Sequence, residues 1–323
     1  SKGIFWFRLP LPMALDHVNV YVIDEGNSWT IIDTGFWSKK TQSIWGEIKE
    51  KWFNDKPIGK VIVTHHHPDH VGLAGWFQTE FKADLWMSRT AWLMARMLRL
   101  DYQKLPTEET INFWRRAGMD DLILNERATG KPFNFGDSVH EMPLGFRRII
   151  DGEKIILGNR SWIVRVGNGH APEHLTLWCE DEPIVIAGDQ IISSISPNLG
   201  VYATEPDADP VQEWLTSCEA FLPFSNDKQL VLPGHKLPFY GLPHRLKQLI
   251  ENHHSALKRL VAFLKEPQTA VDCFPVLFNR KISDNEYGLA LVEAVAHLNH
   301  LYRKKIVKRE LNSKGAYVYT LKN

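Results

Sequence analysis

The stretch THHHPDHVG, residues 64–72, decides how the rest of this chain is interpreted. It places His65, His67, Asp69 and His70 close together, and all four carry side chains that bind metals. Imidazoles at i and i+2, with a carboxylate and a third imidazole just behind them, cannot all face one ion. The spacing therefore predicts two adjacent cations. His66, between two of these residues, is expected to point away.

Three further candidate ligands follow, each behind an apolar run typical of a buried strand. The runs are WIVRV at 162–166, PIVIA at 183–187 and QLVL at 229–232, and the residues behind them are His170, Asp189 and His235. Asp33 ends another such run in the triplet DTG. Active sites of open α/β sheets lie at strand ends, so we expect these residues to converge.

The elements around these residues predict an α/β fold for residues 1–240. Strand-like runs cover 18–24, 29–33 and 60–64, and an amphipathic helix with Ser38 as a cap lies between the last two. From about 85 to 145 the pattern changes to a helical insert. Its segments 86–100 and 107–118 look helical, with Ser88 and Thr107 as caps.

Residues 241–323 are predicted to form a second, small and mainly helical domain. Two long helices over 244–265 and 283–305 precede two short strands within 306–321, an order that resembles a winged helix. This part holds 14 Lys and Arg against 7 Asp and Glu, a net charge of about +7. The apolar stretch 287–301 would suit burial against the other domain or a homodimer interface.

The composition is that of an ordinary globular protein, with 44% hydrophobic and 24% charged residues among 323. Cys179, Cys218 and Cys273 are an odd and scattered set, which argues against a disulfide framework and for a reducing compartment. No apolar run reaches about 18 residues, and the first residues lack the features of a signal peptide. We therefore expect a cytoplasmic protein without a membrane partner.

Over roughly residues 4–240 the chain resembles the metallo-β-lactamase superfamily of hydrolases, whose fold is an αββα sandwich. The resemblance implies one metal at His65, His67 and His170, and a second at Asp69, His70 and His235. Asp189 would bridge the two metals, and Asp33 would orient a ligand histidine. Zinc is the expected metal because most ligands are imidazoles, although iron or manganese would also fit.

Two such cations, about 3.5 to 4 Å apart, make hydroxide available near neutral pH and polarise the bond under attack. The expected reaction is therefore hydrolysis by a metal-bound hydroxide, without a protein nucleophile. Asp69 and Asp189 are the expected catalytic residues, because they would lie close enough to this water to take or relay its proton.

The ligand set narrows the choice among branches of the superfamily. β-Lactamases of this fold have Cys where Asp189 stands, and diiron flavoproteins have Glu where His67 stands. The full set is similar to glyoxalase II-like thioesterases, so we expect a small acyl substrate, held as a thioester or related ester as in glyoxalase II or acyl-CoA thioesterases.

Four residues are candidates for lining the substrate pocket: Tyr202, His174, Trp86 and Arg89. In the insert, apolar side chains would bind the acyl group while arginines meet a carboxylate or phosphate of its carrier. Two alternatives stay open. One is a phosphodiesterase or nuclease that binds nucleic acid through the basic C-terminal domain, and the other is a lactonase in which Tyr202 stabilises the developing oxyanion.

Overall fold

The computed structural model describes residues 2–13 and 15–322, which form two compact units. The first unit comprises Ser1–Tyr102, Phe133–Pro197 and Phe224–Arg245, and the second comprises Gln103–Pro132, Asn198–Pro223 and Leu246–Asn323. These units differ from the predicted domains 1–240 and 241–323. Residues 103–132 and 198–223 group with the C-terminal segments, so the predicted insert is divided between the two units.

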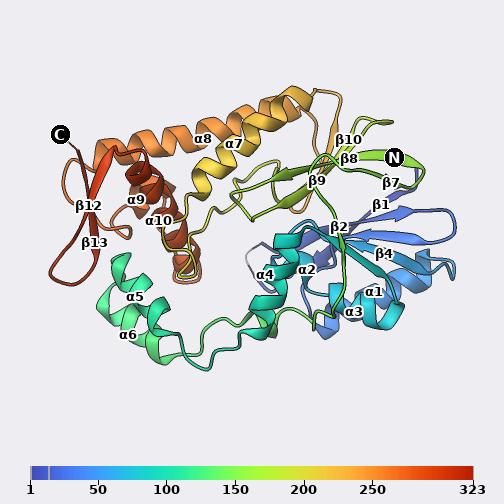
Figure 1. Ribbon diagram of the computed structural model, residues 1–323, viewed down its shortest axis with the longest axis horizontal. Helices are drawn as coiled ribbons and strands as arrows, with labels where there is room; N and C mark the ends of the chain where they lie inside the picture. The colour runs from blue at the N-terminus through green and yellow to red at the C-terminus, as the bar shows by residue number, and fades with distance from the viewer. Residues whose placement is uncertain (1, 14, 323) are drawn as a thin grey trace. The chain divides into compact units, whose positions relative to one another are not determined.

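Two β-sheets form the centre of the first unit (Figure 1). The first sheet has six strands, antiparallel from β1 to β3 and parallel from β3 to β6: β1 (Ile4–Pro10), β2 (His17–Asp24), β3 (Trp29–Ile32), β4 (Ile58–Ile62), β5 (Asp84–Met87) and β6 (Arg147–Arg148). The second has five, of which only β10 and β11 are parallel: β11 (Leu230–Pro233), β10 (Ile184–Gly188), β9 (His174–Cys179), β8 (Arg160–Gly167) and β7 (Lys154–Leu157).

Side chains that alternate along the central strands fill two separate cores. Ile31 and Val61 belong to the core that also contains residues of the helices, whereas Ile32 and Ile62 belong to the core between the two sheets. Figure 1 shows α1 (Lys39–Trp52) and α3 (Ala74–Phe81) on one side of the six-stranded sheet and the green strands of the second sheet on the other. The predicted α/β sandwich is confirmed.

The predicted helix caps Ser38 and Ser88 are confirmed, whereas the predicted start of one helix is wrong. Ser38 Oγ accepts the Thr41 N–H at 3.1 Å before α1, and Ser88 Oγ accepts the Ala91 N–H at 3.3 Å before α4 (Arg89–Leu100). The predicted helix over 86–100 was wrong at its start, because residues 84–87 form β5 between two parallel neighbours. The short helix α2 (Pro68–Val71) and the 3-10 turn η1 (Phe135–Asp137) complete this unit.

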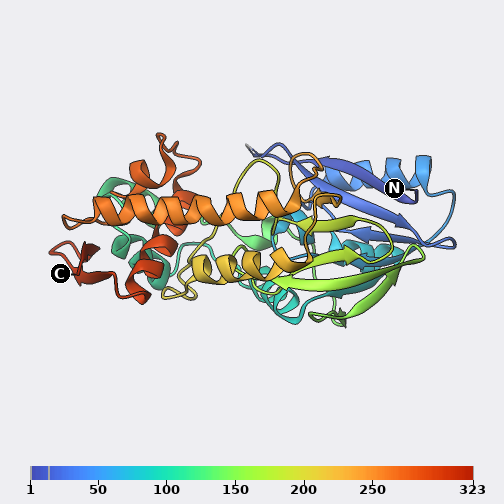
Figure 2. The ribbon, with the colours of Figure 1, turned by 90° about the horizontal axis from the view of Figure 1, so that it is seen from above.

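The second unit is mainly helical, as predicted. It contains α5 (Glu108–Arg116), α6 (Asp121–Thr129), α7 (Pro210–Phe221), η2 (Leu222–Phe224) at its boundary, most of α8 (Leu242–Phe263), α9 (Phe274–Phe278), α10 (Tyr287–Arg303) and the hairpin of β12 (Val307–Leu311) and β13 (Tyr317–Leu321). Figure 2 shows α8 as one continuous orange helix. In the part of the chain that the structure describes, no helix is both long and apolar enough to cross a bilayer.

The helix α10 is buried from Ala290 to Leu301, apart from Glu293, which is half-buried. Its apolar face is therefore used inside the second unit. The reason for expecting this helix at a homodimer interface is removed.

Two buried histidines of the second unit form a pair. The rings of His253 in α8 and His297 in α10 stack at 5.2 Å, with His253 Nδ1 and His297 Nε2 3.0 Å apart. Burial lowers the pKa of His253 to about 3 and that of His297 to about 4. Both imidazoles are therefore neutral in the folded protein near neutral pH.

This pair should make the second unit sensitive to acid. Unfolded histidines titrate near pH 6.5, so between about pH 6.5 and pH 4 the unfolded chain takes up protons that the folded unit excludes. Stability should fall with decreasing pH by up to about 1.4 kcal/mol per pH unit for each histidine. In denaturant unfolding at several pH values, His253→Phe should flatten this decline. The matched variant His254→Phe, at an exposed position, should leave the slope unchanged, and an equally steep slope in both variants would contradict the assignment.

Candidate metal centre

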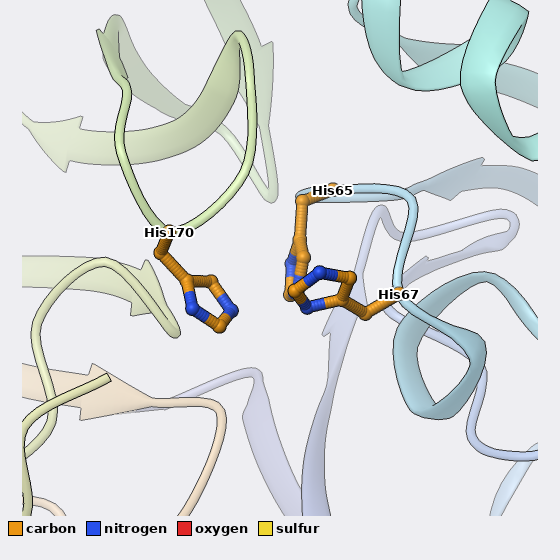
Figure 3. Close-up of side chains that lie close together, drawn as sticks. All are labelled: His65, His67 and His170. Carbon is orange, nitrogen blue, oxygen red and sulfur yellow. The ribbon is translucent and has the colours of Figure 1, made fainter. Parts of the chain in front are cut away.

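All seven predicted ligands come together at the ends of strands in the first unit. They form three clusters, in each of which the candidate ligand atoms lie within 4.8 Å of one another: His65, His67 and His170; His65, His70 and Asp189; and Asp69, His70 and His235. Figure 3 shows the first cluster, with the rings of His65 and His67 from the loop after β4 and the ring of His170 from the loop between β8 and β9 turned toward one another.

Asp189 lies between the two triads that the sequence predicted. Its Oδ2 atom is 3.7 Å from His170 Nε2, 3.4 Å from His70 Nε2 and 3.2 Å from His235 Nε2. Asp69 Oδ2 lies 3.1 Å from His235 Nε2. One carboxylate thus faces imidazoles of both triads.

Hydrogen bonds to the far side of the imidazoles fix their orientation. Asp33 Oδ2 accepts the Nδ1–H of His70 at 2.8 Å and the hydroxyl of Thr64 at 2.9 Å, and its Oδ1 accepts the Thr64 N–H at 2.8 Å. The backbone carbonyl of His17 accepts the Nδ1–H of His235 at 2.7 Å. These contacts leave the Nε2 atoms of His70 and His235 facing the carboxylates, as ligand histidines require.

Burial and neighbouring carboxylates together decide which imidazoles are protonated. Burial lowers the pKa of His65 and of His67 well below the ordinary value, so both are neutral, the form that binds metals. Burial also acts to lower the pKa of His235, but the Asp189 and Asp69 carboxylates outweigh it and raise the pKa to about 10. At such a nitrogen a proton and a cation compete.

The donor atoms fit divalent cations. His65 Nε2 and Asp189 Oδ1 are buried, and neither has a hydrogen-bond partner among the described residues. Buried polar atoms nearly always have a partner. Two such atoms without one in a single cluster therefore favour a bound cation as their partner. Imidazole nitrogens and carboxylate oxygens are the donors that zinc and similar ions take.

Two glycines give the cluster the room that it needs, and sequence reasoning did not single them out. A Cβ atom on Gly234 would lie 2.1 Å from Asp189 Oδ1 and 2.7 Å from His70 Cε1. A Cβ atom on Gly188 would lie 2.5 Å from His174 Cε1. Each glycine precedes a candidate ligand, and that position was the available signal.

His174 is not a pocket-lining residue, because its exposed fraction is 0%. Its Nε2 atom accepts the backbone N–H of Asp189 at 3.1 Å. Its ring also stacks on His65, with centroids 4.5 Å apart and planes at 23°. His174 therefore contacts His65 of the first triad and the backbone of Asp189, and fixes the position of one relative to the other.

His174→Ala should weaken metal binding about 10- to 100-fold, the usual cost of losing a residue that supports ligands. Competition with a chromogenic chelator measures this affinity. His174→Gln, which keeps a hydrogen-bond acceptor, should recover part of the loss. His244→Ala, at an exposed position of the first unit, should bind like the wild type. Unchanged affinity in His174→Ala would refute this role.

The remaining candidates lie elsewhere. Trp86 is half-buried against the core between the sheets, and its ring centroid lies 4.3 Å from Lys60 Nζ and 3.8 Å from Arg147 Cζ. Arg89 is exposed at the first residue of α4. Tyr202 is 51% exposed and belongs to the second unit. His66 is buried and lies outside all three clusters, as expected.

Comparisons with known proteins agree with this geometry. The family model of the metallo-beta-lactamase superfamily matches residues 13–235, and the model of the metallo-beta-lactamase-like C-terminal domain matches residues 257–322. The latter gives no support to a winged helix, which stays a prediction.

Three relatives match along the whole chain. A crystal structure of a beta-lactamase domain protein from Burkholderia ambifaria has a TM-score of 0.91 and 30% identity, over 100% of this chain and 93% of that one. A metallo-beta-lactamase family protein from Thermus thermophilus shares the fold, with a TM-score of 0.82 and 24% identity over 100% and 99% of the two chains. A probable metallo-hydrolase from Bacillus subtilis is 23% identical over 100% and 99% of the two chains.

Proposed function

The chain belongs to the metallo-beta-lactamase superfamily, and we propose that it hydrolyses a thioester or a related ester with two divalent cations, which we take to be zinc. The observation that carries this proposal is the position of Asp189, whose Oδ2 atom lies within 3.7 Å of imidazole nitrogens from both triads. A carboxylate shared between two sets of donors suits a pair of adjacent cations.

Bound cations of this kind lower the pKa of water and polarise the bond under attack. The side chains of this protein would hold the two cations and take up the proton of the attacking water. One cation would be held by His65, His67 and His170 and the other by Asp69, His70 and His235, with Asp189 between them. Asp69 and Asp189 are the groups placed to accept the proton of the attacking water.

The outer face of α4 supports an acyl substrate. Leu93, Met97 and Leu100 follow one another at helical spacing and are 52%, 46% and 69% exposed. Arg89 is exposed one turn before them. The start of α4 is held to the loop that carries His170, because the Thr90 N–H donates to Glu173 Oε2 at 2.6 Å. This stripe suits an acyl chain, and Arg89 suits an anionic group of its carrier.

The proposal predicts a dependence on acyl length. With metal-loaded protein and a panel of glutathione and coenzyme A thioesters, Leu93→Glu should lower kcat/KM for long acyl chains on the order of tenfold, the effect of losing one or two methylene contacts. Acetyl thioesters should be unaffected. Leu122→Glu, at a position 81% exposed on α6, is the matched control. No turnover of any thioester by the wild type would end the thioester proposal.

The nuclease alternative receives less support. On the hairpin, Arg309 pairs with Asp207 at 3.1 Å, Lys308 with Glu310 at 3.3 Å, and Lys314 lies 3.9 Å from Asp121. Basic side chains that already face carboxylates offer less free charge to phosphates. A lactone substrate would require the same metal centre, and the thioester panel extended by lactones distinguishes the two.

A further inference from the structure

The outer edge of β1 has little of the usual protection of a sheet edge over its first four residues. β1 is the end strand of the six-stranded sheet and pairs with β2 over all seven residues without a register shift. Its sequence, IFWFRLP, contains one charged residue, Arg8, and ends on a proline, Pro10. Proteins normally protect such edges with short strands, charges or bulges. The opposite edge of the same sheet does so, since β6 has two residues and both are arginines.

The backbone of β1 offers hydrogen-bonding groups to that open edge. The Leu11 N–H donates to the Asp16 carbonyl, and the Gly3 carbonyl accepts from the Asp24 N–H, so the odd-numbered residues direct their backbone groups toward β2. Backbone groups of successive strand residues point to opposite sides. Those of Ile4, Trp6 and Arg8 are therefore directed outward, where no strand pairs with them in the part of the chain that the structure describes.

A groove runs beside the same edge, between β1 and α1. It has a volume of about 190 Å³, with apolar walls and a rim of opposite charges, and is lined by Phe7, Arg8, Ile44, Glu47, Ile48, Lys51 and Trp52. Trp52 is 52% exposed, and Trp6 on the other face of β1 is 39% exposed. Edge and groove together form a surface that would accept a further strand with aromatic side chains.

We propose that this strand is β1 of a second copy of the chain, paired antiparallel across a twofold axis so that the two six-stranded sheets become continuous. The register that fits best places Phe7 opposite Phe7 of the second copy. Residues with outward backbone groups then face one another, because Trp6 lies opposite the second copy's Arg8. Each Phe7 ring meets the groove beside the other, and a twofold contact requires such self-complementarity.

Charge complementarity favours a second copy over an unrelated peptide. The register brings a guanidinium next to an indole twice, a favourable cation–π arrangement. Arg8 reaches that indole only by leaving His17 of β2, whose Nδ1 atom lies 2.8 Å from Arg8 Nη2. The rim residues Glu47 and Lys51, 3.3 Å apart, also carry opposite charges and so meet their own copies without net repulsion.

Cysteine cross-linking tests the register. Directly opposed residues in a non-hydrogen-bonded antiparallel pair have Cα atoms about 4.5 Å apart, within the range of a disulfide. Phe7→Cys should therefore form a disulfide-linked dimer under mild oxidation. Phe5→Cys is the matched control, because its thiols would lie about 14 Å apart in this register. The wild type, with Cys179, Cys218 and Cys273, should remain uncross-linked.

The solution mass tests the dimer without any assay of activity, so its outcome is independent of the proposed function. The wild type should sediment at twice the chain mass of 37.2 kDa. Phe7→Glu, which loses two apolar contacts and opposes two carboxylates, should raise the dissociation constant on the order of 100-fold. Phe133→Glu, 72% exposed in the first unit, should remain dimeric. A monomeric wild type, a dimer unaffected by Phe7→Glu, or equal cross-linking at Phe5→Cys and Phe7→Cys would each overturn the proposal.

Discussion

Asp189→Ala should abolish hydrolysis almost completely and lower the metal content at both positions. Asp189 Oδ2 is within reach of His170 in one triad and of His70 and His235 in the other. Removing this carboxylate takes a donor from both cations and one candidate proton acceptor. We expect a loss in kcat/KM on the order of 10³-fold, equal to about 4 kcal/mol.

Metal analysis and kcat/KM, measured on the same protein preparations, check this prediction. Metal analysis should find two ions per chain in the wild type and fewer than one in Asp189→Ala. Asp189→Asn, which keeps the shape and loses the charge, should lie between them. Asp227→Ala changes an exposed aspartate of the first unit and should behave as the wild type. If Asp189→Ala keeps both ions, the bridging position is wrong.

Gly234→Ala should disrupt the same centre from the backbone side. The added methyl would lie 2.1 Å from Asp189 Oδ1 and 2.7 Å from His70 Cε1, so one or both side chains must move. Displacements of about 1 Å at a reacting group cost on the order of 100-fold in rate. We expect a loss of this size in kcat/KM together with weaker metal binding, both normalised to the folded fraction from circular dichroism.

Gly46→Ala is the matched control for this substitution. Gly46 is exposed within α1, and a Cβ atom there meets nothing within 4 Å. Alanine should stabilise the helix by about 1 kcal/mol and leave the rate unchanged. If Gly234→Ala is as active as Gly46→Ala, the close approach at Asp189 does not limit the site.

The ligand residues could be predicted because their pattern is local. The spacing of His65, His67, Asp69 and His70 is visible in the sequence, and the later candidates each follow an apolar run. The contacts of His174 with Asp189 and His65 depend on how separate strands stack, which no spacing reveals. The grouping of residues 103–132 with the C-terminal segments could not be predicted either, because it depends on packing between residues far apart in the sequence. The packing of Trp86 against the core between the sheets is likewise a non-local contact that the sequence does not reveal.

The ligands are divided between the two sheets, and this has a consequence for how the chain matures. His65 to His70 follow β4 of the six-stranded sheet, whereas His170, Asp189 and His235 follow β8, β10 and β11 of the other. A nascent chain emerging from the ribosome carries four of the seven candidate ligands long before the other three exist. A cation that needs ligands from both sheets could bind tightly only after β11 is synthesised and both sheets have docked, and its binding would then stabilise the docked sheets.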